Sequence, residues 1–153
     1  MFFPCNTNIN ERYRRYIWYG EYAAGSIVLV RLGGWPWWPA MVDDCPDIEQ
    51  YYCLDSCFSF SDIPTHYHVI FFDASEVSRA WLTPLQLKPY SQNKDLVKSA
   101  VKNKNYRKCL EVLFTRVNDA ERLPLQPRLK KYSFISCRSR EKSEFSQIEQ
   151  KIQ

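Results

Sequence analysis

The sequence predicts a mainly β fold: a small five-stranded antiparallel barrel followed by a helical segment. Five short apolar segments follow one another closely between residues 27 and 82, with tight connections and no helical pattern between them. After Pro89 the apolar residues change from strand-like to helix-like spacing. The 153 residues suffice for one domain with flanking segments, and a hydrophobic content of 45% is ordinary for a globular protein.

The first strand is predicted at Ile27–Val30, an apolar run that ends before Gly33 and Gly34. An irregular arch follows, because Pro36 and Pro39 lack the backbone donors that an interior strand needs. The remaining strands are predicted at Trp38–Asp43, Gln50–Leu54, Tyr67–Phe72 and Val77–Leu82, with a single turn at Thr83–Leu85.

Helices are predicted after Ser91, where apolar residues recur at helical spacing. The stripe consists of Leu96, Val97, Ala100, Val101, Tyr106, Cys109, Leu110, Leu113 and Val117. Asn103–Asn105 is expected to interrupt the helical pattern and Leu123–Pro127 to end it. The predicted organisation is therefore an N-terminal arm (1–22), a barrel (23–90), helices (91–121) and a basic tail of low order (122–153).

Charge is unevenly distributed behind the net value of +4. Residues 1–90 carry six basic and ten acidic side chains, whereas residues 91–142 carry fourteen basic and five acidic ones. This split favours a protein that contacts a cationic ligand with its first half and a polyanion with its second. A solvated basic helix and tail without a partner is the alternative.

The six cysteines predict reduced thiols and an intracellular location, because no C-x-x-C pair and no secreted disulfide pattern is present. The group that most resembles a metal site comprises Cys45, Cys53, Cys57, His66 and His68. Its spacing lacks the tight ligand pairs of zinc fingers, so we expect no bound metal.

Membrane, secreted and enzymatic functions are not expected. No apolar run approaches the roughly 18 residues that span a bilayer, and Met1–Asn6 lacks the features of a secretion signal. No nucleophile elbow, P-loop, dinucleotide-binding or metalloprotease motif is present. We therefore expect no catalysis, no cofactor and no small-molecule substrate.

The arch carries the residues with the most specific chemistry. Trp35 and Trp38 flank a proline corner, so their indoles can be held nearly perpendicular, and Phe71 ends a strand that can pass beside them. Three rings meeting in this way form a pocket for a weakly hydrated cation such as a methylated ammonium. The alternative is that these rings only pack in the core.

The same residues carry a resemblance to a known family. Pro36–Pro39 spells P-W-W-P, the signature of the PWWP domain, a chromatin-binding barrel of the Royal superfamily with an SH3-like fold. Further blocks resemble the family's first strand, its later strands and its exit into helices, and they lie at 25–32, 67–73, 78–82 and 85–90. The resemblance covers about residues 22–120. The Ser78–Trp81 block is most similar to the CW-type zinc finger and PWWP domain proteins, and the N-terminal domain of MutS-homologue mismatch-repair proteins is similar too.

The resemblance implies a role for each residue of the candidate site. Trp35, Trp38 and Phe71 correspond to the family's aromatic cage, and Leu32 to an additional apolar wall. The implied ligand is a trimethylated lysine on the histone H3 tail, most often the mark of transcribed gene bodies. Asp73, Ser75 and Glu76 are implied peptide contacts. Implied contacts to nucleosomal DNA are Arg31, Lys102, Lys104, Arg107 and Lys108, and the implied location is nuclear.

Two alternatives from other functional classes stay open at this point. The first is a DNA-binding module whose aromatic pocket is vestigial and whose binding to nucleosomes does not depend on methylation. The second is a protein–protein adaptor that acts through residues 1–22 and the tail.

Overall fold

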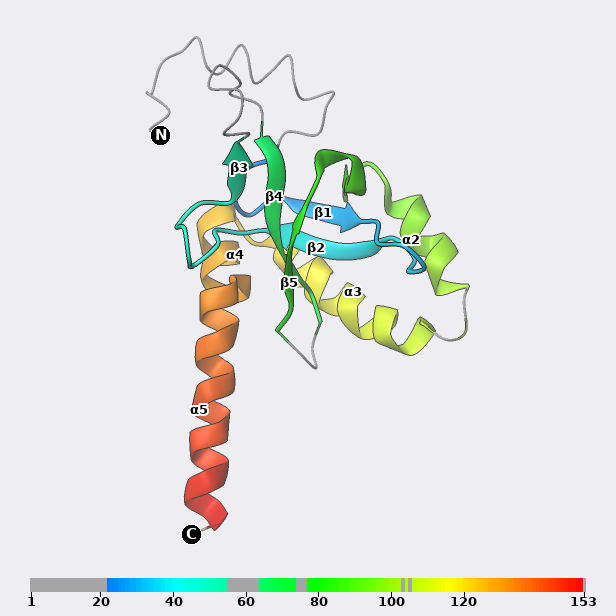
Figure 1. Ribbon diagram of the computed structural model, residues 1–153. Helices are drawn as coiled ribbons and strands as arrows, with labels where there is room; N and C mark the ends of the chain where they lie inside the picture. Colours follow the sequence, from blue (N-terminus) through cyan, green and yellow to red (C-terminus); the bar gives the residue numbers. More distant parts are fainter. Residues whose placement is uncertain (1–21, 55–63, 74–76, 103, 105, 153) are drawn as a thin grey trace.

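The computed structural model describes residues 22–54, 64–73, 77–102, 104 and 106–152. In these residues, six strands form one curled antiparallel sheet, and four α-helices follow it (Figure 1). The strands are β1 (Ile27–Val30), β2 (Trp38–Val42), β3 (Tyr52–Leu54), β4 (Pro64–Phe71), β5 (Arg79–Leu82) and β6 (Leu87–Pro89). The α-helices are α2 (Lys94–Val101), α3 (Arg107–Arg122), α4 (Leu125–Tyr132) and α5 (Phe134–Ile152), and the 3₁₀ turn η2 (Pro84–Gln86) precedes β6.

The mainly β fold with C-terminal helices is thus confirmed. A strand forms at each of the five predicted places, although their ends differ by up to three residues. The sheet has the order β3-β4-β2-β1-β6, and β5 pairs with β4. The short strand β6, which the sequence did not predict, extends the sheet by pairing with β1 in the register Leu29↔Lys88.

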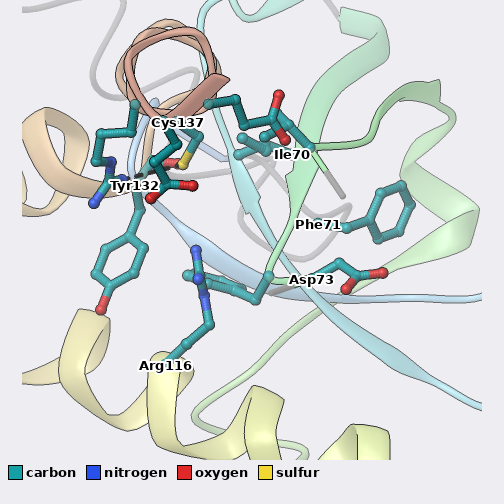
Figure 2. Close-up of a pocket in the computed structure, with 11 residues that line it drawn as sticks. Ile70, Phe71, Asp73, Arg116, Tyr132 and Cys137 are labelled. Carbon is teal, nitrogen blue, oxygen red and sulfur yellow. Dashed lines mark hydrogen bonds between the residues drawn. The ribbon is translucent and has the colours of Figure 1, made fainter. Parts of the chain in front are cut away.

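Apolar side chains are buried on both faces of the sheet, which explains why the strands are apolar runs rather than simple alternations. Inside the curl, the core includes Val28 and Val30 of β1. On the outer face, Leu29 belongs to a second core together with residues of the helices. Part of this second core lies where Ile70 of β4 approaches Tyr132 and Cys137 (Figure 2).

Residues 125–152 differ from the expected tail of low order, because they form α4 and α5. Pro127 does not prevent α4, since it lies in the first turn, where a backbone N–H has no partner within the helix. Tyr132 and Cys137 are buried against the barrel and α3. Tertiary packing, which local composition does not reveal, therefore gives this segment its order.

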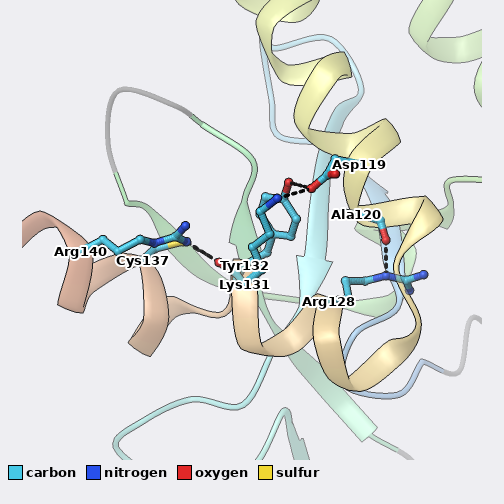
Figure 3. Close-up of polar contacts among 7 residues, drawn as sticks. All are labelled: Asp119, Ala120, Arg128, Lys131, Tyr132, Cys137 and Arg140. Carbon is cyan, nitrogen blue, oxygen red and sulfur yellow. Dashed lines mark hydrogen bonds and ion pairs between the residues drawn. The ribbon is translucent and has the colours of Figure 1, made fainter.

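Arg128 fastens α4 to the rest of the domain through four backbone carbonyls, of which Figure 3 draws that of Ala120. Its Nε donates to the Ala120 carbonyl at 2.6 Å, and its Nη1 donates to the Gly25 carbonyl at 2.8 Å. Its Nη2 donates to the carbonyls of Leu123 at 3.0 Å and Glu121 at 3.4 Å. One guanidinium on α4 thus joins the end of α3 and Gly25, which lies two residues before β1. We call this set of bonds the Arg128 clamp.

A second attachment caps α5. The buried carboxylate of Asp43, just after β2, accepts a 2.7 Å hydrogen bond from the backbone N–H of Phe134, the first residue of α5. Beyond this docked end the helix extends away from the barrel (Figure 1). Its distal side chains Ile148 and Ile152 are exposed.

Burial makes the Asp43 attachment sensitive to pH. Desolvation raises the pKa of Asp43 from 3.8 to about 6, although the Phe134 hydrogen bond lowers it. The folded protein therefore holds this proton more tightly than the unfolded chain does. The contribution of Asp43 to stability is fully present below pH 4 and is lost as the pH rises toward 6.

Replacement of Asp43 by asparagine removes this titration while retaining an oxygen that accepts from Phe134. Relative to Asp43→Asn, the wild type is expected to lose on the order of 2–3 kcal/mol of unfolding free energy between pH 4 and pH 7. Urea denaturation of both proteins at each pH measures the difference. The raised pKa of Asp43 is contradicted if the difference in unfolding free energy between the two proteins does not change with pH, or if it shifts in favour of the wild type as the pH rises.

Candidate functional site

The residues of the predicted cage line one pocket of about 200 Å³, which we call the cage pocket. It lies where the arch between β1 and β2 meets the end of β4. Its lining consists of Val30, Leu32, Trp35, Pro36, Trp38, Phe71, Asp73 and Ser78. Sequence reasoning missed Val30, Pro36 and Ser78, which carry no chemical signal of their own.

The two indoles of the arch are nearly perpendicular. The ring centroids of Trp35 and Trp38 are 6.0 Å apart, and the planes meet at 83°. A turn positions Trp35: its backbone N–H donates to the Leu32 carbonyl at 3.1 Å, and Gly34 has a φ of +81°, which glycine adopts without strain. Trp38 begins β2 opposite Val30. Trp35 is 54% exposed, whereas Trp38 is partly buried, so the indole walls are open to solvent mainly at Trp35.

Phe71 comes to the pocket from a distant part of the chain. Antiparallel pairing of β4 with β2 places Phe71 opposite Ala40, two residues after Trp38. The Phe71 N–H donates to the Ser78 carbonyl at 3.0 Å, which holds the end of β4 beside the start of β5. The structure therefore brings together the two stretches of chain that carry the predicted cage.

A fourth ring supports the two indoles. The centroid of Tyr106, the residue before α3, lies 5.4 Å from that of Trp35 and 6.3 Å from that of Trp38. Its plane is at 82° to the Trp38 plane. The sequence placed Tyr106 in the apolar stripe of the helices, and that periodicity gave no sign of a contact with the arch. Ring contacts of this kind restrict the indoles and so favour a preformed pocket.

The lining of the cage pocket suits a weakly hydrated cation. Rings and aliphatic groups make up most of its wall, and the faces of aromatic rings attract positive charge. Asp73 adds a carboxylate at the wall of the pocket. An unmethylated ammonium would lose strong hydration on entry, whereas a methylated one loses less. On entry into such a lining, a weakly hydrated cation therefore loses less hydration than a strongly hydrated one.

The predicted DNA contacts are all exposed. Lys102, Lys104, Arg107 and Lys108 flank Tyr106 in sequence and so border the arch. Arg31, next to β1, lies over the Trp37 ring at 5.8 Å. Sequence reasoning missed Lys88, whose ammonium lies over the same ring at 5.0 Å. The cationic side chains and the cage pocket thus share the arch side of the domain.

Other candidate residues do not form a site in the described part of the chain. Ser75, Glu76 and Cys57 lie outside the described residues. Among the residues described, no group of three or more His, Cys, Asp or Glu side chains is arranged to hold a metal ion. His68 is fully buried, its Nδ1 lies 2.7 Å from the Asp43 carbonyl oxygen, and burial lowers its pKa. Within the same described ranges, no helix has the length and apolar content to cross a membrane.

The curled sheet and its aromatic pocket define a small β-barrel binding module. The sequence pattern of the PWWP domain matches residues 25–124, and the chain belongs to the PWWP family. The predicted resemblance to this family is thereby confirmed. PWWP domains in general are chromatin- or DNA-binding modules.

Curated relatives include proteins with the same domain. The chain is 36% identical over 119 residues to the mouse zinc finger CW-type PWWP domain protein 1, covering 77% of this chain and 18% of the relative. It is 32% identical over 121 residues to the human protein of that name, with the same coverages. The chicken DNA mismatch repair protein Msh6 is 28% identical over 92 residues, which are 60% of this chain and 6% of Msh6. The chain thus spans less than a fifth of the length of these relatives.

Among solved structures, the second PWWP domain of WHSC1L1 covers 66% of this chain and 89% of its own chain, at 21% identity and a TM-score of 0.37.

Proposed function

We propose that this protein is a non-catalytic chromatin reader that binds trimethylated lysine on a histone H3 tail. The lysine side chain enters the cage pocket between Trp35, Trp38 and Phe71, with Leu32 as an apolar wall. One observation carries the proposal: two indoles at 83° and 6.0 Å line the same pocket as a phenylalanine from a distant strand. Family membership supports it, because the family's general role is in chromatin.

The peptide is proposed to lie across the segment that follows β4. Asp73 lines the cage pocket and is suited to accept from the peptide backbone or to pair with a basic side chain. Ser75 and Glu76 follow it in sequence and stay predicted contacts. A carboxylate beside an aromatic pocket suits a basic tail better than a neutral peptide.

Nucleosomal DNA is the proposed second anchor, and a nuclear location follows from it. Contacts between a methylammonium and three rings provide only about 0.5–2 kcal/mol each, so the peptide alone is bound weakly. Exposed cationic side chains beside the arch contact DNA phosphates, and their contribution to the binding free energy depends on salt rather than on methylation. The cage pocket then selects the mark, while phosphate contacts supply affinity.

The DNA anchor predicts a specific change in salt dependence. The double variant Lys104→Ala/Lys108→Ala is expected to bind free duplex DNA more weakly and to reduce the slope of log K against log[salt] by about 2, because each phosphate contact contributes about 1. Lys142→Ala is the control, since Lys142 is exposed on α5 away from the arch. A slope equal to that of the wild type would rule out these lysines as phosphate contacts.

Titration of a panel of methylated H3 peptides tests the reader function. The wild type is expected to bind one trimethylated peptide and to discriminate against its unmethylated form, whereas Trp35→Ala loses this discrimination. Nucleosomes with and without the same mark complete the test. If both are bound equally and only salt changes the affinity, the protein is a DNA-binding module with a vestigial cage.

A further inference from the structure

A second pocket, of about 170 Å³, lies between the end of β4 and the helices α3, α4 and α5 (Figure 2). Its walls carry charged side chains from three elements: Asp73 after β4, Arg116 of α3, and Arg140, Glu141 and Glu144 of α5. Figure 2 shows Arg116 rising from α3 toward α5, while Cys137 closes the opposite wall. The cage chemistry makes no use of this pocket.

The second pocket adjoins the cage pocket. Phe71 and Asp73 line both of them. The Phe71 ring is turned away from Arg116 and Tyr132, so the segment 71–73 forms the partition between the two pockets (Figure 2). A peptide whose methylated lysine occupies the cage pocket therefore passes close to the second one. An extended chain advances about 3.3 Å per residue, so side chains within four residues are within reach.

The two arginines of the second pocket contact neutral groups of the fold, and the buried Nε of Arg116 has no hydrogen-bond partner among the described residues. The Arg116 guanidinium lies 5.6 Å from the centre of the Tyr132 ring. Arg140 donates to the Lys131 carbonyl and lies 3.3 Å from the Cys137 sulfur (Figure 3).

The carboxylates of α5 are less engaged. Glu141, which is partly buried, pairs with the exposed Arg138 at 3.4 Å. Glu144 is exposed and has no hydrogen bond or ion pair with any residue that the structure describes. Among the described charged side chains that line the second pocket, Glu144 is therefore an exposed carboxylate free to pair with an incoming cation.

We propose that the second pocket binds a basic side chain, arginine or lysine, that lies within four residues of the methylated lysine in the same peptide. Glu144 is its main partner, with Glu141 and Asp73 beside it. This inference rests on the proposed function, because the cage pocket fixes where the peptide lies. It also gives α5, which follows the segment that matches the family, a part in ligand selection.

The test uses synthetic peptides that carry one trimethyl-lysine among neutral residues and a single arginine at each of the four positions on either side. When the arginine lies on the side of the trimethyl-lysine that faces the second pocket, the wild type is expected to bind the peptide about threefold to tenfold more tightly than the peptide without arginine. Glu144→Gln is expected to lose this gain. Glu149→Gln is the matched control, since Glu149 is exposed on the same helix but does not line the pocket.

Two results would overturn the inference. The first is that the wild type binds all the arginine peptides with equal affinity. The second is that Glu144→Gln keeps the arginine-dependent gain in affinity to the same extent as Glu149→Gln. In both cases, continued preference for the trimethylated over the unmethylated peptide leaves the proposed reader function intact. Loss of that preference in the wild type would overturn both proposals.

Discussion

Replacement of Trp38 by alanine is expected to weaken binding of a trimethyl-lysine peptide by about 30- to 100-fold, or about 2–3 kcal/mol. Trp38 supplies one of two perpendicular indole faces, and it also contacts Tyr106, which supports the other indole. Its removal therefore opens the cage pocket and loosens the remaining wall. Isothermal titration calorimetry with matched trimethylated and unmethylated peptides measures the loss.

Trp37→Ala is the matched control for this variant. Trp37 belongs to the same arch and is also partly buried, but it does not line the cage pocket. It is expected to keep peptide affinity within about threefold of the wild type. Free DNA binding of Trp38→Ala is expected to stay close to that of the wild type, which also shows that the variant is folded. Equal loss of peptide affinity in both variants would contradict the assignment of the cage.

Replacement of Arg128 by alanine is expected to destabilise the domain by about 2–4 kcal/mol. The Arg128 clamp satisfies carbonyls of Gly25, Ala120, Glu121 and Leu123 with one charged group, and its removal leaves them without this donor. Lysine is expected to restore less than half of the loss, because a single ammonium cannot reproduce the planar fork of the guanidinium. Chemical denaturation followed by far-UV circular dichroism measures these differences.

Lys130→Ala provides the control, since Lys130 is exposed on the same helix. It is expected to change the unfolding free energy by less than about 0.5 kcal/mol. Equal stabilities of Arg128→Ala and Lys130→Ala would show that the clamp does not hold α4 on the barrel. The same measurement reports indirectly on α5, which follows α4 after Tyr132 and forms one wall of the second pocket.

The strands were predictable because short apolar runs in the sequence indicate buried strands. Ile27–Val30 is apolar throughout, and both of its faces are covered in the structure. Strand β6 escaped prediction because Leu87–Pro89 is too short to show a period, and its pairing with β1 defines it. Helices α4 and α5 were not predicted because Pro124 and Pro127 suggest that helical structure ends there. The contacts that stabilise these helices, made by Arg128 and Asp43, join residues far apart in the sequence, and a local pattern does not reveal them.

The candidate site was predictable in its rings but not in its surroundings. The arch places Trp35 and Trp38 three residues apart. The place of Phe71 at the end of a strand, and then the resemblance to PWWP domains, indicated it as the third ring. Tyr106 was not predicted as a support, because helical periodicity assigned it to the core. Glu144 was not considered, because it lies in a segment that was expected to lack order. The domain boundaries at residues 22, 90 and 121 and the roles of the site residues stay predictions.

The central claim is that Trp35 and Trp38 enclose a trimethylated lysine. Two-dimensional ¹H–¹⁵N NMR resolves the indole N–H signal of each tryptophan, and variants at positions 35 and 38 assign them. Addition of a trimethyl-lysine H3 peptide is expected to shift the signals of Trp35 and Trp38 and to leave that of Trp81 unchanged, while the unmethylated peptide at the same concentration shifts none. Unmoved signals of Trp35 and Trp38 during saturable binding of the methylated peptide would contradict the claim.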